Sequence, residues 1–149
     1  MPKRTTGYFL ALLALSFFLL GMGDMGAGSE KTPRRPQENF TATVTDRSQN
    51  KLAVTHVHCE GKTSIKGYLG EMRLTLTFAK IKQVDFSPAT SGYVDGTVRF
   101  RDGEPREFRF KNLTRCYGDA DVGQLMIRLR DLKQIVFDDA NPAAPEAGQ

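Results

Sequence analysis

The chain of 149 residues carries 21 lysines and arginines against 17 aspartates and glutamates, which gives a formal net charge of +4. This length suits one ordinary domain or two very small ones. Acidic and basic residues alternate along most of the sequence, whereas a nucleic-acid-binding protein usually concentrates its bases. The composition therefore argues against nucleic acid as a partner.

The N-terminus has the features of a targeting segment. Lys3 and Arg4 precede a strongly apolar run over 8–20, which has the length of a signal-peptide core, and small residues at 27–29 supply a cleavage point. We therefore predict that residues 1–29 are a signal peptide and that the protein is exported, either periplasmic or secreted. The alternative is an uncleaved N-terminal membrane anchor, because the uncharged stretch 5–23 is just long enough to cross a bilayer.

Composition divides the remaining chain into three parts. Residues 30–39 are polar and contain prolines, as a linker does. Residues 138–149 offer no apolar face to bury, so we expect a disordered tail. The folded domain is predicted to span 40–137.

Apolar and polar residues alternate repeatedly within this domain. A period of two, enriched in threonine and aromatic residues, is typical of half-buried antiparallel strands. No stretch after the leader has the pattern of a long amphipathic helix. The alternation predicts that Met72, Leu74, Leu76 and Phe78 share one buried face.

One segment occurs twice in nearly the same form. IKQVDF at 81–86 returns as LKQIVF at 132–137, and the two copies align without gaps from residues 70 and 121 onward. The spacing of apolar residues in this segment predicts a tight turn that leads the chain into a short closing strand. We therefore interpret the two segments as the ends of two related units.

The hairpins upstream of these segments support the same interpretation, because opposed residues in a hairpin must face the same side. A loop at 46–50 sets Val44 against Leu52, and a loop at 102–106 sets Phe100 against Phe108. We predict an all-β fold, a tandem duplication of a four-strand unit (40–86 and 96–137). Because one such unit is too small to be stable alone, the two would pack into a small antiparallel sandwich or barrel.

Cys59 and Cys116 lie in similar contexts, HCEG and RCYG. In an exported protein, two cysteines at similar places in related units indicate a disulfide between them. The alternative is a pair of buried free thiols. A catalytic thiol pair is not indicated, since there is no Cys-x-x-Cys motif.

The segment HVHCE places His56 and His58 two residues apart. In a regular strand both imidazoles would project from one face, at a spacing that suits zinc or copper. Further ligands are not evident in the sequence. The alternative is a strand end with one half-buried and one exposed histidine.

The second hairpin carries a basic face of Arg99, Arg109 and Lys111. In the predicted register Arg99 opposes Arg109, and such like-charge pairs need a counter-ion. An acidic partner surface, a phosphate or a carboxylated polysaccharide would supply one. Neighbouring carboxylates on a solvated face are the alternative.

The usual catalytic signatures are absent from the sequence, so we predict that the protein is not an enzyme and has no cofactor. We expect an exported, non-catalytic module that binds or assembles with another envelope or extracellular macromolecule, either a protein or a polysaccharide. The alternative is a periplasmic metal-binding protein that uses His56 and His58 to hold zinc or copper.

Overall fold

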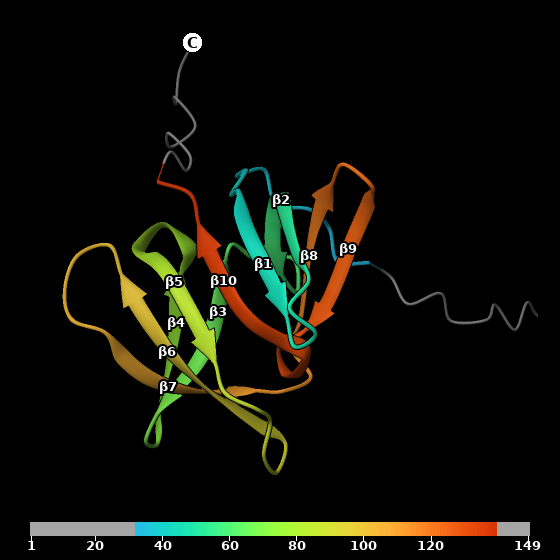
Figure 1. Ribbon diagram of the computed structural model, residues 1–149. Helices are drawn as coiled ribbons and strands as arrows, with labels where there is room; N and C mark the ends of the chain where they lie inside the picture. The colour runs from blue at the N-terminus through green and yellow to red at the C-terminus, as the bar shows by residue number, and fades with distance from the viewer. Residues whose placement is uncertain (1–31, 140–149) are drawn as a thin grey trace, which may run out of the picture. The chain divides into compact units, whose positions relative to one another are not determined.

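The computed structural model describes residues 32–139, and the domain is formed by the part of the chain that follows Thr32. The predicted leader and most of the predicted tail lie outside these residues. Within the described range no helix is long and apolar enough to cross a membrane. The strands shown in Figure 1 are β1 Ala42–Asp46, β2 Lys51–Cys59, β3 Ser64–Leu69, β4 Met72–Thr77, β5 Ile81–Phe86, β6 Tyr93–Phe100, β7 Arg106–Lys111, β8 Arg115–Ala120, β9 Gly123–Arg128 and β10 Leu132–Phe137.

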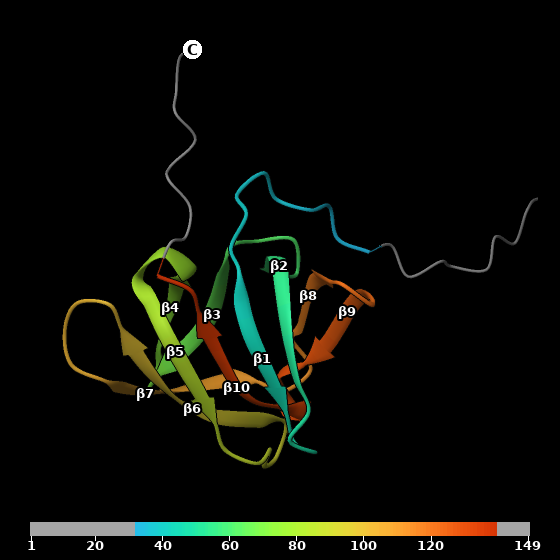
Figure 2. The ribbon, with the colours of Figure 1, turned by 45° about the horizontal axis from the view of Figure 1, so that its top comes forward.

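All ten strands belong to one antiparallel sheet, in the order β4-β3-β7-β6-β5-β10-β1-β2-β8-β9. The sheet curls into a half-barrel whose edge strands are β4 and β9, as the turned view in Figure 2 makes visible. The all-β prediction is thus confirmed. A single curled sheet stands in place of the predicted sandwich or closed barrel.

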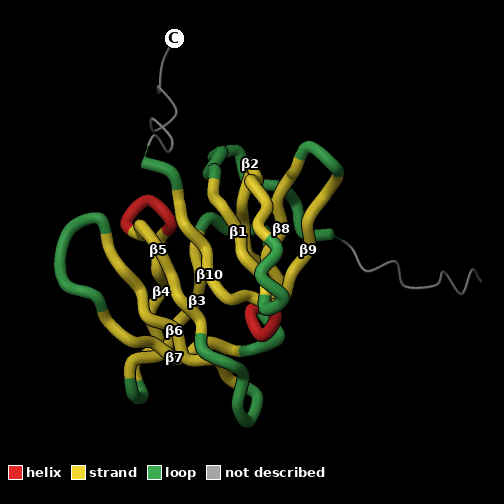
Figure 3. Tube along the Cα trace, in the orientation of Figure 1, coloured by secondary structure: helices red, strands yellow, loops and turns green. Residues whose placement is uncertain are grey.

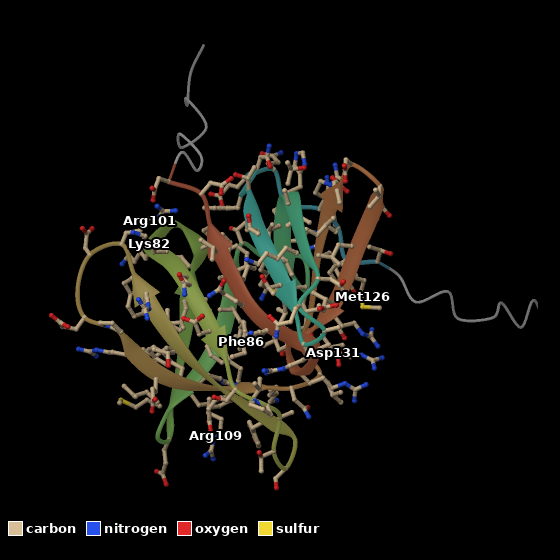
Figure 4. All side chains as sticks on the ribbon, viewed as in Figure 1. Lys82, Phe86, Arg101, Arg109, Met126 and Asp131 are labelled. Carbon is tan, nitrogen blue, oxygen red and sulfur yellow. A yellow bond between two sulfur atoms is a disulfide. The ribbon has the colours of Figure 1, made fainter. Side chains whose placement is uncertain are left out.

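One hydrophobic core fills the inside of the curl. Its centre is built from aromatic rings in contact: Phe78 and Phe137 lie 4.8 Å apart between ring centroids, and Phe86 meets Phe110 edge to face at 5.6 Å. Phe86 lies inside the curl in Figure 4, whereas Arg109 projects away from it. The closing segments of the sequence therefore carry residues of the core.

The described chain contains the same order of elements twice. β1 to β5 form the first half and β6 to β10 the second, and in each half a short 3-10 turn precedes the last strand. These turns, Phe78–Lys80 and Leu129–Asp131, are the helical segments of Figure 3. The predicted tight turn before each closing strand is thus present, a few residues earlier than the apolar spacing indicated.

The order of the strands interleaves the two halves. β5 and β10 pair at the middle of the sheet, with Val84 opposite Ile135. The β3–β4 hairpin of the first half lies beside β7, and the β8–β9 hairpin of the second half lies beside β2. Corresponding strands of the two halves lie at the same distance from opposite edges of the sheet. Each half is interrupted by strands of the other, so neither half forms a continuous sheet by itself.

β3 and β8 were not predicted, so each half has five strands where the sequence indicated four. Glycines at Gly67 and Gly118 occupy inward-facing positions and interrupt the apolar alternation. A Cβ at Gly67 would lie 3.0 Å from the Phe110 ring, and one at Gly118 would lie 3.1 Å from the Val54 side chain. Close packing therefore requires glycine at both positions, and these glycines break the apolar alternation by which the two strands would have been recognised.

The first hairpin has the predicted register, with Val44 opposite Leu52. The second does not: Asp95 opposes Arg109, and Val98 opposes Arg106. The strands have slid by four residues relative to the prediction. An even slide leaves every side chain on its original face, so alternation cannot distinguish the two registers.

The predicted inward face of β4 is only partly correct. Leu76 is buried and Phe78, in the 3-10 turn, is buried as well, but Met72 is 61% exposed and Leu74 36%. β4 is an edge strand, so it has a neighbouring strand on one side only. An edge position therefore exposes residues that a central strand would bury.

Replacing either closing phenylalanine should be costly because both are buried in the aromatic core. We expect Phe86→Ala and Phe137→Ala each to lower the free energy of unfolding by about 3–5 kcal/mol in denaturant melts. Val122→Ala, at a side chain 82% exposed, is the control and should change it by less than about 0.5 kcal/mol. A near-neutral result at either phenylalanine would contradict the shared core.

Candidate functional site

Two seams join hairpins of different halves, and they differ in structure. In the closed seam, β2 and β8 pair at three positions, including Cys59 opposite Cys116. These cysteines form a disulfide, and both are buried. The predicted bond is therefore present, and it holds the second hairpin of one half against a strand of the other.

The closed seam also contains a β-bulge, which the regular strand predicted from HVHCE lacks. The register of β2 against β8 shifts between Thr55 and His58, and His56 has a positive φ of 51°. The backbone N–H of His56 donates to Asn39 Oδ1 at 2.8 Å, which holds this unusual conformation. The two imidazoles therefore do not follow the spacing of an unbroken strand.

His58 is packed into the closed seam. It is 4% exposed, and its ring stacks on Tyr117 with the centroids 5.2 Å apart. The Gly61 backbone N–H donates to His58 Nδ1 at 3.2 Å. Burial lowers the pKa of His58 below its usual value, and the charge of Arg35 adds to this effect against the opposing charge of Asp119. The neutral ring is thus the form that the fold favours.

His56 lies in a different environment. Its Nδ1 is 3.3 Å from the Asp119 carboxylate without the alignment of a hydrogen bond, and Asp119 pairs with Arg35 at 2.5 Å. Glu38 accepts a hydrogen bond from the Thr63 hydroxyl at 2.6 Å. The end of the segment predicted as a linker is therefore fastened across the closed seam.

His56 and His58 are two residues apart in the sequence, but their Nδ1 atoms have different neighbours. Asp119 lies beside that of His56, and Gly61 donates to that of His58. Among residues 32–139, no three or more histidine, cysteine, aspartate or glutamate side chains gather as a metal site would require. Zinc or copper binding by this pair stays a prediction of the sequence.

The open seam lies between β3 and β7, the counterparts of β8 and β2. In the chain described, these strands share one registered pair, Tyr68 opposite Arg109. A hollow of about 450 Å³ lies beside them, lined by Ser64, Lys66 and Tyr68 of β3 and by Lys111 of β7. The seam that a disulfide closes in one half of the sheet is thus a groove in the other.

Basic side chains line this groove. We call it the cationic groove and define it by Lys62, Lys66, Tyr68, Arg73 and Lys111. The four bases come from the β2–β3 turn, β3, β4 and the end of β7, and all four are exposed. Within the described range none of them forms an ion pair, and Glu60 is the one acidic residue of the lining.

A second hollow, of about 340 Å³, adjoins the cationic groove at Tyr68. We call it the mixed hollow; its polar lining is Asp95, Glu107 and Arg109. Arg109 pairs with Asp95 at 3.2 Å and lies over the Tyr93 ring at 5.8 Å. Tyr93 in turn meets Tyr68 edge to face at 6.3 Å. The ring of Tyr68, which lines both hollows, is therefore packed against Tyr93.

The predicted basic face of Arg99, Arg109 and Lys111 is divided by the corrected register. Arg99 lies 3.9 Å from Asp85 on β5, and Arg109 pairs with Asp95, so carboxylates neighbour both. The predicted opposition of Arg99 and Arg109 is wrong, because Arg109 opposes Asp95. Lys111 alone of the three lines the cationic groove.

Sequence reasoning missed Lys62, Lys66 and Arg73. Tyr68 opposes Arg73 across the β3–β4 hairpin, and Lys66 lies two residues before Tyr68 on the same face. The hairpin that places them together begins with the unpredicted β3. The run of alternating polar residues Ser64, Lys66 and Tyr68 was the available signal for this face.

The chain belongs to a family described as uncharacterised protein, whose model matches residues 36–140. No curated protein and no solved structure matches the chain. The family match spans the described β domain, including both seams.

Removing the disulfide should lower stability strongly, because the bond closes a loop with a sequence separation of 57. We expect Cys59→Ala/Cys116→Ala to reduce the free energy of unfolding by about 4 kcal/mol on the chain-entropy account. Denaturant melts with and without reductant measure this. Reductant should weaken the wild-type protein and leave the double variant unchanged; equal stability of the two proteins in the absence of reductant would contradict the structural role of the bond.

Lowering the pH should weaken the fold through His58. Because the folded state depresses its pKa, an unfolded chain takes up a proton below the usual value of 6.5 that the folded chain does not. The free energy of unfolding should therefore fall as the pH drops below 6.5 and level off beneath the folded pKa. In His58→Asn, which keeps an acceptor for Gly61, this part of the pH dependence should be missing. Parallel pH profiles for the two proteins would refute the assignment.

Proposed function

We propose that this protein is an exported, non-catalytic module that binds an anionic envelope or extracellular macromolecule in the cationic groove. The observation that carries the proposal is the set of four exposed bases around one hollow, without ion-pair partners in the described chain. Bases held around a concave surface raise the local concentration of anions and strengthen their binding.

The bases of the groove are not a requirement of the fold. The second half places Tyr117 and Gln124, 51 residues further on, where the first half has Lys66 and Arg73. The same strands thus form with uncharged side chains at these positions. A binding role gives a reason for bases that the architecture does without.

Two observations support export. A disulfide between Cys59 and Cys116 suits an oxidising compartment outside the cytoplasm, and the basic, apolar and small-residue pattern of 1–29 is that of a signal peptide. Export would present the cationic groove to the envelope or to the surrounding medium. Acidic polymers and acidic protein surfaces are then the partners within reach.

We also infer that the two halves arose by tandem duplication. Supporting this are the repeated order of elements, the recurrence of β3, β4 and β5 as β8, β9 and β10 at a separation of 51 residues, and the equivalent packing of Gly67 and Gly118. Duplication would supply two seams of common origin. One is closed by a disulfide, and the other is available for binding.

The alternative, a periplasmic protein that holds zinc or copper through His56 and His58, has less support. His58 Nδ1 already accepts a hydrogen bond, and His56 Nδ1 lies beside a carboxylate that is paired with Arg35. A metal bound through either Nδ1 would have to displace these contacts. The cationic groove requires no such rearrangement.

Removing charge from the groove should weaken polyanion binding. We expect Lys66→Gln/Arg73→Gln to raise the Kd of the purified full chain for at least one of polyglutamate, polygalacturonate and polyphosphate by about tenfold. Lys82→Gln/Lys133→Gln removes the same charge from exposed positions on β5 and β10, and should leave the Kd near that of the wild-type protein. If no polymer distinguishes the two variants, the groove is not the binding site and the proposal fails.

A further inference from the structure

On the premise of the proposed function, the chemical class of the ligand can be specified further. The cationic groove continues past its basic side chains into the mixed hollow. Tyr68 lines both the cationic groove and the mixed hollow. A ligand extending past Tyr68 leaves a region of positive charge and enters one with two carboxylates and a guanidinium. The two hollows, about 450 and 340 Å³, are of the size that holds small ligands or polymer segments.

We propose that the open seam binds an acidic polysaccharide, with a carboxylated sugar in the cationic groove and the hydroxyls of the adjoining sugar in the mixed hollow. Bases around the groove would bind the sugar carboxylate by charge-assisted hydrogen bonds. The Tyr68 ring lies between the hollows and offers an apolar face to a sugar ring as well as a hydroxyl.

The mixed hollow suits neutral hydroxyl groups better than anions. Glu107 has no partner in the described chain and offers an acceptor for a hydroxyl hydrogen. Asp95 and Arg109, which pair with each other, present an acceptor and a donor side by side. A hydroxyl both donates and accepts, so it can satisfy such a surface, whereas an anion here would meet Glu107 and Asp95 with like charge.

Acidic polysaccharides fit the open seam better than polymers with closely spaced charges do. The charges of a nucleic acid or polyphosphate follow one another closely along the chain, and duplex DNA carries about one negative charge per 1.7 Å. Such a chain would place phosphates against Glu107 and Asp95 as it crosses the mixed hollow. A polysaccharide has ring faces and hydroxyls between its carboxylates, which matches the sequence of surfaces along the seam.

Tyr68 is held in place for this role. Tyr93 lies edge to face with it at 6.3 Å, and Arg109 lies over Tyr93. Tyr68 also forms the registered pair with Arg109 that keeps β3 against β7. A ring fixed in this way loses little conformational freedom on binding, so the contact contributes to affinity rather than to ordering of the side chain.

The test compares the affinity of the purified full chain for polygalacturonate, the same polymer fully methyl-esterified, polyglutamate and polyphosphate, at one salt concentration. We expect polygalacturonate to bind at least about tenfold more tightly than the other three, by analogy with a lost charge-assisted contact. Esterification keeps the sugars and removes the charge, and polyglutamate keeps the charge and removes the sugars. Equal or tighter binding of polyphosphate or polyglutamate would overturn the polysaccharide proposal while leaving a general anion groove standing.

Variants at Tyr68 and Glu107 provide a second readout. Tyr68→Leu and Glu107→Gln should each weaken polygalacturonate binding several-fold, and Tyr68→Phe, which keeps the ring, should stay closer to the wild-type protein. Tyr68→Leu should change polyglutamate binding little, whereas Glu107→Gln should not weaken it, because a like charge is removed. Thermal melts show whether each variant is folded, and Glu107→Gln changes an exposed side chain. If Tyr68→Leu and Glu107→Gln are folded and neither loss of the ring nor loss of the carboxylate affects polymer selectivity, the sugar-binding assignment is wrong. Absence of any polymer binding would instead refute the proposed function itself.

Discussion

The pairing of β5 with β10 at the middle of the sheet is the constraint on which the rest of the structure depends. It joins the closing strands of the two halves, with Val84 opposite Ile135, and leaves each half's second hairpin beside a strand of the other. Neither half can complete a sheet alone, so folding, the shared aromatic core and both seams require the whole domain. The disulfide adds a covalent link at one of the places where the halves meet. This link lowers the conformational entropy of the unfolded chain and so stabilises the fold.

The two seams are formed by corresponding strands but differ in structure. Between β2 and β8, a bulge, a disulfide and the stack of His58 on Tyr117 draw the strands together. Between β3 and β7 one registered pair remains, and the widening gap is lined by bases. The two seams meet at the β2–β3 turn, because the disulfide residue Cys59 also lines the cationic groove. The disulfide therefore fixes one wall of the groove.

The sequence predicted the β class, the first hairpin and the disulfide, because alternation, turn residues and paired cysteines are local or nearly local signals. It failed where tertiary packing decides. Gly67 and Gly118 replace apolar residues in β3 and β8 because neighbouring side chains fill the space of a Cβ. The second hairpin has its actual register because an even slide preserves the faces and Asp95 can then oppose Arg109. The cationic groove was beyond prediction, since its bases meet only when the halves exchange hairpins.

The most direct test of the account is amide chemical-shift mapping by NMR of the full chain, titrated with a short galacturonate oligosaccharide. The account predicts saturable shifts at Lys62, Lys66, Tyr68, Glu107 and Lys111. The pair Thr55 and Asp119, at the end of the closed seam away from the disulfide, should be unaffected. Shifts confined to Thr55 and Asp119, or to β1 and β10, would contradict a binding site in the open seam.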